Sequence, residues 1–262
     1  MALPLSPKKH LGQNFLSDPN TARKIAAAVR AGAGEPVVEI GPGTGALTEP
    51  LLDRFPNLVA LEVDPRAVAY LRAQRPALDV REVDVLEADW AALADELGGP
   101  LYVVGNLPYY ITSPILFGLL EAAPHVREAV VMMQLEVAQR LVAVPRTKDY
   151  GILAVQVQLR ARPALLFRVS RNVFFPKPDV TSAVVRLDFG AAPPAPDVDA
   201  AFLTEVVRAA FNQRRKTLRN SLGRWTREQN LGLPHGWDGA RAEELTPGEF
   251  VELARYLQDA RP

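Results

Sequence analysis

The chain has 262 residues, enough for one large domain and a small one or for two of moderate size, and 48% of them are apolar. Its 30 basic residues balance 30 acidic ones. It contains no cysteine, which excludes disulfides, thiolate metal sites and cysteine nucleophiles, and its three scattered histidines predict no metal site. No apolar run is long enough to span a bilayer, so the composition predicts a soluble, cytoplasmic protein without a membrane partner.

Strand and helix signals alternate through the first half of the chain. Asp18 is the expected N-cap of the first helix, and prolines at 19 and 65 open two helices. Near-continuous apolar strands separated by helices predict an α/β fold with a parallel sheet covered on both faces. The expected strands are 37–40, 58–63, 78–83, 101–104 and 128–134, and the expected helices are 19–31, 46–54, one opening at Pro65, and 136–144.

The second half changes character. A strand pair at 165–171 and 182–189 is followed by a proline-rich linker at 190–196, and then by two segments with helical spacing, 199–211 and 247–257. Charge changes as well, because residues 35–99 hold thirteen acidic and five basic side chains, whereas 140–227 hold sixteen basic and six acidic ones. A polarised basic surface suits a polyanion, although ordinary solvated faces explain the same counts.

A glycine-rich turn, residues 41–45, lies between the first expected strand and the next helix. Glycine lets the backbone turn tightly and lets a ligand approach the main chain. Glu62 follows about twenty residues on, where a carboxylate can hold a ribose. Asp84 follows the third strand and could accept from an adenine amine, although a helix cap or solvated turn explains it too. The turn also satisfies the dinucleotide fingerprint, so it predicts an adenosine-containing cofactor without saying which.

The segment Asn106-Leu107-Pro108-Tyr109 follows the fourth strand. It resembles the motif of amino-methyltransferases that modify adenine N6 in nucleic acids. The Asn106 side-chain oxygen and the Leu107 carbonyl can accept from the two N–H groups of an adenine amine, which directs its lone pair toward a methyl group. Pro108 fixes the backbone, and Tyr109 offers a face for an extruded base. The alternative is a strand-end turn with buried tyrosines.

Three further segments, 8–16, 173–187 and 210–220, occur in the same order as in one family. With the two motifs above, the chain resembles the ribosomal RNA adenine dimethyltransferases, and most of all their bacterial small-subunit branch, the kasugamycin-resistance enzymes. The resemblance implies a Rossmann-like class I methyltransferase domain at 1–190, a small all-helical domain contacting RNA at 197–262, and S-adenosylmethionine as cofactor.

The resemblance also implies a role for individual residues. Phe174 would stack on the target adenine opposite Tyr109, with Phe175 a weaker candidate, although core packing is a common role for any buried aromatic. The catalytic set is then Asn106, Leu107, Pro108, Tyr109 and Phe174; the cofactor-binding set is Asn14, Leu16, Gly41, Gly43, Glu62, Asp84 and Asn106; and the RNA-binding set is Arg214, Arg215, Lys216 and Arg219.

The expected reaction is N6,N6-dimethylation of two adjacent adenosines in a loop near the 3′ end of 16S rRNA, with a role in biogenesis of the 30S subunit and the protein a monomer. Three alternatives stay open. One is a macrolide-resistance methyltransferase acting on 23S rRNA, one is a non-catalytic ribosome-assembly factor, and one is a nicotinamide-dependent dehydrogenase. The last gives no reason for the Asn106–Tyr109 motif.

Overall fold

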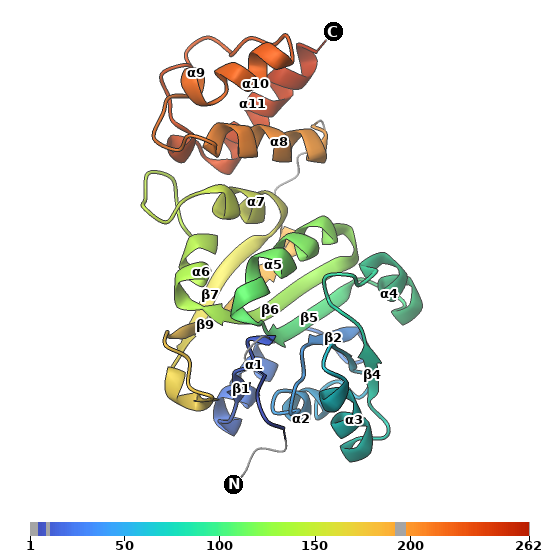
Figure 1. Ribbon diagram of the computed structural model, residues 1–262. Helices are drawn as coiled ribbons and strands as arrows, with labels where there is room; N and C mark the ends of the chain where they lie inside the picture. The colour runs from blue at the N-terminus through green and yellow to red at the C-terminus, as the bar shows by residue number, and fades with distance from the viewer. Residues whose placement is uncertain (1–4, 9–10, 192–197, 262) are drawn as a thin grey trace. The chain divides into compact units, whose positions relative to one another are not determined.

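The computed structural model describes residues 5–8, 11–191 and 198–261, and the chain divides into two compact units (Figure 1). The first unit comprises 1–138 and 163–190, and the second comprises 139–162 and 191–262. The second unit therefore takes in residues 139–162, which a boundary at the proline-rich linker alone assigns to the first domain. Most of that linker, 192–197, lies outside the described residues, as does the expected domain start at 197.

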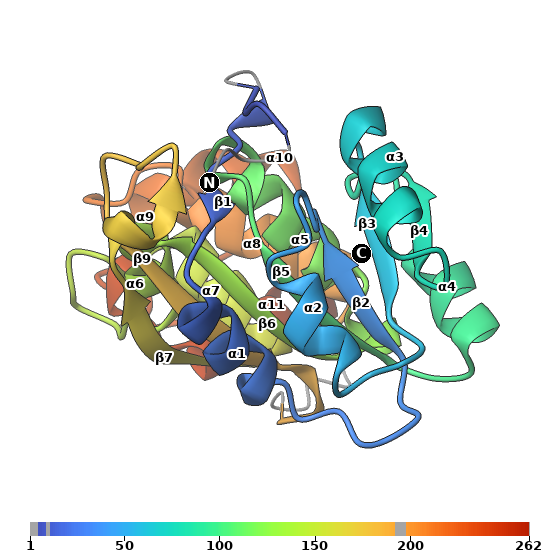
Figure 2. The same ribbon diagram turned by 90° about the horizontal axis from the view of Figure 1, so that it is seen from below.

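A seven-stranded sheet forms the frame of the first unit, in the order β4-β3-β2-β5-β6-β9-β7 (Figures 1 and 2). The neighbours from β4 to β6 pair in parallel, as the sequence predicts, and β9 joins β6 antiparallel. A separate pair, β1 with β8, is antiparallel. The strands are β1 (Phe15–Leu16), β2 (Val37–Ile40), β3 (Val59–Glu62), β4 (Asp79–Glu82), β5 (Leu101–Asn106), β6 (Val126–Gln134), β7 (Arg162–Val169), β8 (Phe174–Phe175) and β9 (Ser182–Asp188).

The central strands are buried along both faces. All residues of β2 and β3 are buried, which is the pattern of strands covered by helices on either side. Asp18 and Asp64 cap their helices as N-caps, each accepting a backbone N–H. The helices of the first unit are α1 (Pro19–Ala28), α2 (Thr48–Leu52), α3 (Pro65–Gln74), α4 (Trp90–Leu97) and α5 (Thr112–Glu121), and α6 (Leu135–Leu141) crosses into the second unit.

The second unit is built from helices around its own apolar core. Tyr150, in the segment before α7, is fully buried there and donates its hydroxyl hydrogen bond to the Leu245 carbonyl at 2.7 Å. Its ring lies edge-on to Phe211. The packing of such residues explains why 139–162 belongs to this unit. Its helices are α7 (Ile152–Arg160), α8 (Ala200–Phe211), α9 (Leu218–Ser221), α10 (Gly223–Glu228) and α11 (Pro247–Asp259).

None of the helices in the described part of the chain combines the length and apolar character needed to cross a membrane. The α/β class expected from the alternating signals is confirmed, with the carboxyl ends of the parallel strands gathered at one edge of the sheet. In such a sheet ligands bind at that edge.

Candidate active site

The turn after β2 provides a backbone wall. Gly41, Gly43 and Gly45 all have left-handed φ angles, +63°, +56° and +85°. A Cβ on Gly43 would lie 2.9 Å from the Phe15 ring, so that position is also tightly packed. A Cβ on Gly41, by contrast, would meet nothing within 4 Å, and Gly41 lines a cavity. The main chain at residue 41 is therefore open to a ligand.

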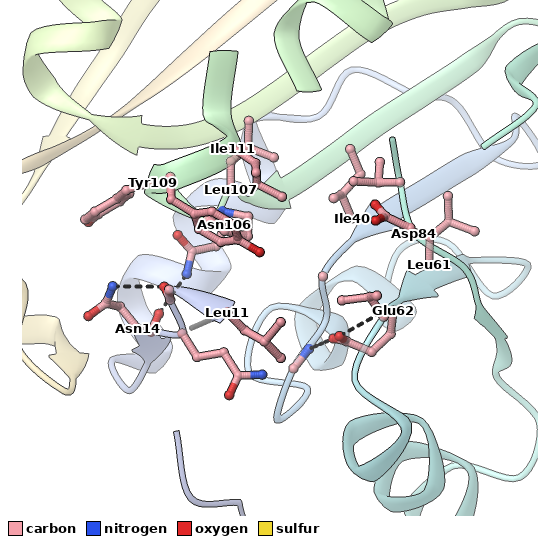
Figure 3. Close-up of a pocket in the computed structure, with 18 of the residues that line it drawn as sticks. Leu11, Asn14, Ile40, Leu61, Glu62, Asp84, Asn106, Leu107, Tyr109 and Ile111 are labelled. Carbon is pink, nitrogen blue, oxygen red and sulfur yellow. Dashed lines mark hydrogen bonds between the residues drawn. The ribbon is translucent and has the colours of Figure 1, made fainter. Parts of the chain in front are cut away.

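Glu62, the last residue of β3, is held rigidly at the cavity wall. Its Oε2 accepts the Gly43 N–H at 2.9 Å, and its Oε1 accepts the Val63 and Asp64 N–H groups, each at 2.9 Å. The side chain is 5% exposed. Burial raises the pKa of Glu62 above its ordinary value, while the three backbone N–H groups act in the opposite direction. The result is a fixed acceptor beside the glycine turn (Figure 3).

Asp84 lies beyond the end of β4 on the same cavity. Its Oδ1 accepts the Leu86 N–H at 2.9 Å, which orients the carboxyl group. Figure 3 shows Asp84 beside Ile40 and Leu61, two apolar side chains that also line the cavity. A carboxylate next to apolar walls suits a flat ring that carries a donor at its edge.

Asn106, the last residue of β5, has its amide orientation set by the main chain. Its Nδ2 donates to the Asn14 carbonyl at 3.0 Å. Because a carbonyl can only accept, the NH₂ end must face Asn14, and Oδ1 is the end left to accept from another donor. The next residue is fixed too, since the Leu107 N–H donates to the Met132 carbonyl at 3.0 Å.

Tyr109 is fixed by its hydroxyl. That group hydrogen-bonds the Ser182 hydroxyl at 2.7 Å, and Ser182 is fully buried at the start of β9. Burial raises the pKa of Tyr109, so the phenol stays neutral. Pro108 has φ −60°, and its carbonyl accepts from the Thr112 hydroxyl at 2.9 Å. Tyr109 therefore lines the cavity from a rigid turn (Figure 3).

An N-terminal arm, residues 11–16, lies along the cavity. Five of its residues, 11–15, line the cavity, and Asn14 is one of them. Leu16 is different: it is buried and pairs with Phe174 between β1 and β8. The structure therefore brings Asn14 to the cavity as predicted, and places Leu16 in the apolar core beneath it.

Phe174, which the resemblance implies as the stacking residue, is buried, whereas Phe175, the weaker candidate, is exposed. Phe174 is 4% exposed, packs in the apolar core and lies outside the set of described residues that line the cavity. Phe175 is 55% exposed and pairs with Phe15, which lines the cavity. Side chains alternate across a strand, so only one of two neighbours can face outward. The structure thus buries Phe174 and exposes Phe175, and the stacking of Phe174 on the target adenine stays a prediction.

The predicted RNA-binding residues all lie in the second unit. Arg214 pairs with Glu243 through Nε at 2.7 Å, and Arg219 pairs with Asp238. Arg215 and Lys216 are exposed. Arg214, Arg215 and Lys216 line one hollow of this unit with Lys148.

The described cavity brings together most of the predicted site. Each of its predicted residues ends a strand, follows one or belongs to the arm, and the list is Asn14, Gly41, Gly43, Glu62, Asp84, Asn106, Leu107, Pro108 and Tyr109. Sequence reasoning missed the apolar walls, Tyr110, and Ser182, which holds Tyr109. Tyr110 is 57% exposed, and the only local signal for it was its place beside Tyr109.

Known proteins resemble this chain along nearly its whole length. The family described as "Ribosomal RNA adenine dimethylase" matches residues 5–259. "Ribosomal RNA small subunit methyltransferase A" of Salinibacter ruber is 57% identical over 257 residues, covering 98% of this chain and 87% of that protein. The protein of the same name from Aromatoleum aromaticum is 46% identical, covering 97% of this chain and 96% of that protein.

Two solved structures match in fold. The 23S rRNA methyltransferase ErmE has a TM-score of 0.68 and 30% identity, over 94% of this chain and all of that one. A dimethyladenosine transferase from Plasmodium falciparum has a TM-score of 0.75 over 91% of this chain and 95% of that one. At 24% identity, this match shows a shared fold only. The chain belongs to the ribosomal RNA adenine dimethylase family, a family of rRNA methyltransferases, which confirms the resemblance drawn from its motifs.

Proposed function

We propose that this enzyme uses S-adenosylmethionine to dimethylate N6 of two adjacent adenosines in a loop near the 3′ end of 16S rRNA. The substrate would be the 30S subunit or its precursor in the cytoplasm, with the enzyme acting as a monomer in subunit biogenesis. One observation carries the proposal. Asn106 and Tyr109, suited to an adenine amine, line the same cavity as Glu62 and Asp84, suited to an adenosine-containing cofactor.

The residues of this cavity fit S-adenosylmethionine. Gly41 leaves open space where any side chain would project. The buried Glu62 carboxylate would accept from the ribose hydroxyls, and Asp84 would accept from the adenine amine between Ile40 and Leu61. Asn14 would contact the cofactor from the arm. When bound, the cofactor supplies an electrophilic methyl group.

The protein's part in the chemistry is to orient a weak nucleophile. The lone pair of an adenine amine is delocalised into the ring, so the amine reacts poorly until it becomes more tetrahedral. Asn106 Oδ1 would accept one amine N–H, and the Leu107 carbonyl the other. The Pro108 carbonyl is already engaged by Thr112, which leaves the Leu107 carbonyl as the second acceptor on this turn. Positioning and exclusion of water then supply most of the rate.

The target base would lie on the face of Tyr109. Bases in a loop unstack at low cost, so an rRNA loop can present them to such a pocket. Phe175, exposed and paired with Phe15, is better placed than Phe174 for a second aromatic contact. Arg214, Arg215, Lys216 and Arg219 would contact phosphates, with the exposed Arg215 and Lys216 the most available.

The small subunit is favoured because the relative from Salinibacter ruber carries that name at 57% identity, whereas ErmE, a 23S rRNA methyltransferase, is 30% identical. The large-subunit reaction is the second candidate on the strength of that structural likeness. A purely non-catalytic assembly role leaves the intact Asn106–Tyr109 turn unexplained.

The test is transfer of labelled methyl groups from S-adenosylmethionine to unmethylated 30S subunits, 50S subunits and naked 16S rRNA, with Asn106→Ala in parallel. We expect N6,N6-dimethyladenosine in the small subunit only, and loss of the label with the variant. Label in 23S rRNA would support the second candidate. Binding to 30S subunits with no label in any RNA would refute catalysis.

A further inference from the structure

Asp64 is a buried carboxylate that the reaction described above does not use. It follows the Glu62 turn, is 0% exposed, and caps α3. Within its own helix it accepts from Arg66, through the backbone N–H at 3.2 Å and through Nη2 at 2.6 Å. Through these two bonds the carboxylate caps the helix and pairs with the Arg66 guanidinium.

Two more donors reach Asp64 from the N-terminal part of the chain. Gln13 Nε2 donates to Oδ2 at 3.1 Å, and Lys8 Nζ donates to Oδ1 at 3.3 Å. Gln13 is also tied to Lys8, because its Oε1 accepts the Lys8 N–H at 2.8 Å. The hydrogen bonds from Arg66, and then from Gln13 and Lys8, hold the pKa of Asp64 well below its usual range. The Asp64 carboxylate is therefore ionised at neutral pH, and Lys8 and Gln13 are attached to it.

The attached segment is the arm that lines the cavity. Residues 11–15 line the same cavity as Glu62, and Figure 3 shows Leu11 and Asn14 of this arm there. The arm's other attachments lie at the far end, where the Asn14 carbonyl accepts from Asn106 and Phe15 pairs with Phe175. Asp64 is thus the attachment on the cofactor side of the arm.

We propose that Asp64 is a positioning residue for the cofactor: its carboxylate anchors the arm through Gln13, and through Lys8 just before the arm, across the cavity that would hold S-adenosylmethionine. The inference rests on the proposed function, since it takes that cofactor to be the ligand. Two methyl transfers to one nitrogen require the spent cofactor to leave between them. The anchor therefore slows release of the cofactor between the two transfers.

The experiment compares Asp64→Asn and Lys8→Met with the intact protein, and uses Asp89→Asn, a substitution at an exposed helix cap, as control. Asp89 also caps a helix, accepting the Ala92 N–H at 3.0 Å, and lies outside the cavity lining. Calorimetry gives the S-adenosylmethionine Kd, stopped-flow fluorescence gives its dissociation rate, and unfolding curves report folding. We expect Asp64→Asn to raise both quantities about tenfold and Lys8→Met about threefold, as the loss of hydrogen bonds to a charged group implies.

A structural role alone would lower stability and leave cofactor exchange unchanged. The KM for S-adenosylmethionine should rise while kcat at saturating cofactor stays near that of the intact protein, and Asp89→Asn should change neither. Folded Asp64→Asn or Lys8→Met with an unchanged Kd and dissociation rate would overturn the proposal; if Asp64→Asn does not fold, Lys8→Met decides. Failure of the intact protein to bind S-adenosylmethionine would instead refute the proposed function.

Discussion

Gly105, in β5, lies between the glycine turn that follows β2 and the Asn106–Tyr109 turn that follows β5. It lies opposite Ile40 in the register of β2 and β5, directly before Asn106, while Ile40 directly precedes Gly41. A Cβ at Gly105 would lie 2.7 Å from the Ile40 carbonyl oxygen and 3.1 Å from the Ile40 Cβ. Gly105→Ala therefore forces two paired strands apart, because a backbone atom in a sheet cannot rotate away as a side chain can.

The size of the effect follows from that overlap. Restoring ordinary contact requires a shift of about 0.5 to 1 Å. Overpacking of this kind costs about 1–3 kcal/mol of unfolding free energy. The shift falls between the glycine turn and Asn106, and a misplacement near 1 Å in an active site can cost about 10²-fold in rate. We expect kcat/KM for methyl transfer to fall by about ten- to a hundredfold.

Gly118→Ala in α5 is the control, since a Cβ there meets nothing within 4 Å. In a helix that exchange should add about 0.5–1 kcal/mol of stability. Urea unfolding and methyl transfer to unmethylated 30S subunits measure the two effects for both variants. A Gly105→Ala protein with the stability and kcat/KM of the parent would refute the reasoning.

Three further predictions concern other residues. Burial raises the pKa of Glu39 from its ordinary 4.5 to about 8. Between these two pH values the folded protein keeps a proton on Glu39 that the unfolded chain has released. Stability should then fall as pH rises through this window, by up to about 1.4 kcal/mol per pH unit, and Glu39→Gln should flatten that slope in urea unfolding; parallel slopes would contradict this. Phe174→Ala should cost about 3–5 kcal/mol of stability, whereas Phe175→Ala should leave stability within about 0.5 kcal/mol and weaken RNA binding about tenfold; equal unfolding curves would count against it. Replacing Arg215 and Lys216 together with glutamine should lower the salt slope of 30S binding by about 2, and an unchanged slope would show that neither neutralises a phosphate.

The strands and the residues that follow them could be predicted because their signals are local. The strand at 37–40 has the predicted bounds, and Glu62, Asp84 and Asn106 lie at neighbouring strand ends, which a parallel sheet brings to one edge. The helix expected from 46 starts at Thr48 instead, because the turn continues past Gly45 with its left-handed φ. Helices α4, α5 and α7 have no predicted counterpart, although Asp89 and Gly98 are ordinary cap residues for α4.

The arm and the second unit show what local signals do not contain. Lys8 contacts Asp64 across 56 positions of chain, and Asn106 contacts Asn14 across 92. Such pairs depend on how the strands pack, so no window of sequence contains them. Likewise, a proline-rich linker marks where the chain is extended, whereas α7 belongs to the second unit because its apolar side packs with α8 and α11.

Under the proposed function, the arm also links the cofactor site and the RNA site thermodynamically. Residues 11–16 bond to Asp64, two residues after Glu62, and to Asn106, the first residue of the Asn106–Tyr109 turn. Any free energy that cofactor binding contributes to ordering the arm reappears in the affinity for RNA, and RNA binding must return the same amount to the cofactor. A substitution in the arm that contacts neither ligand can thus change both affinities by one common factor.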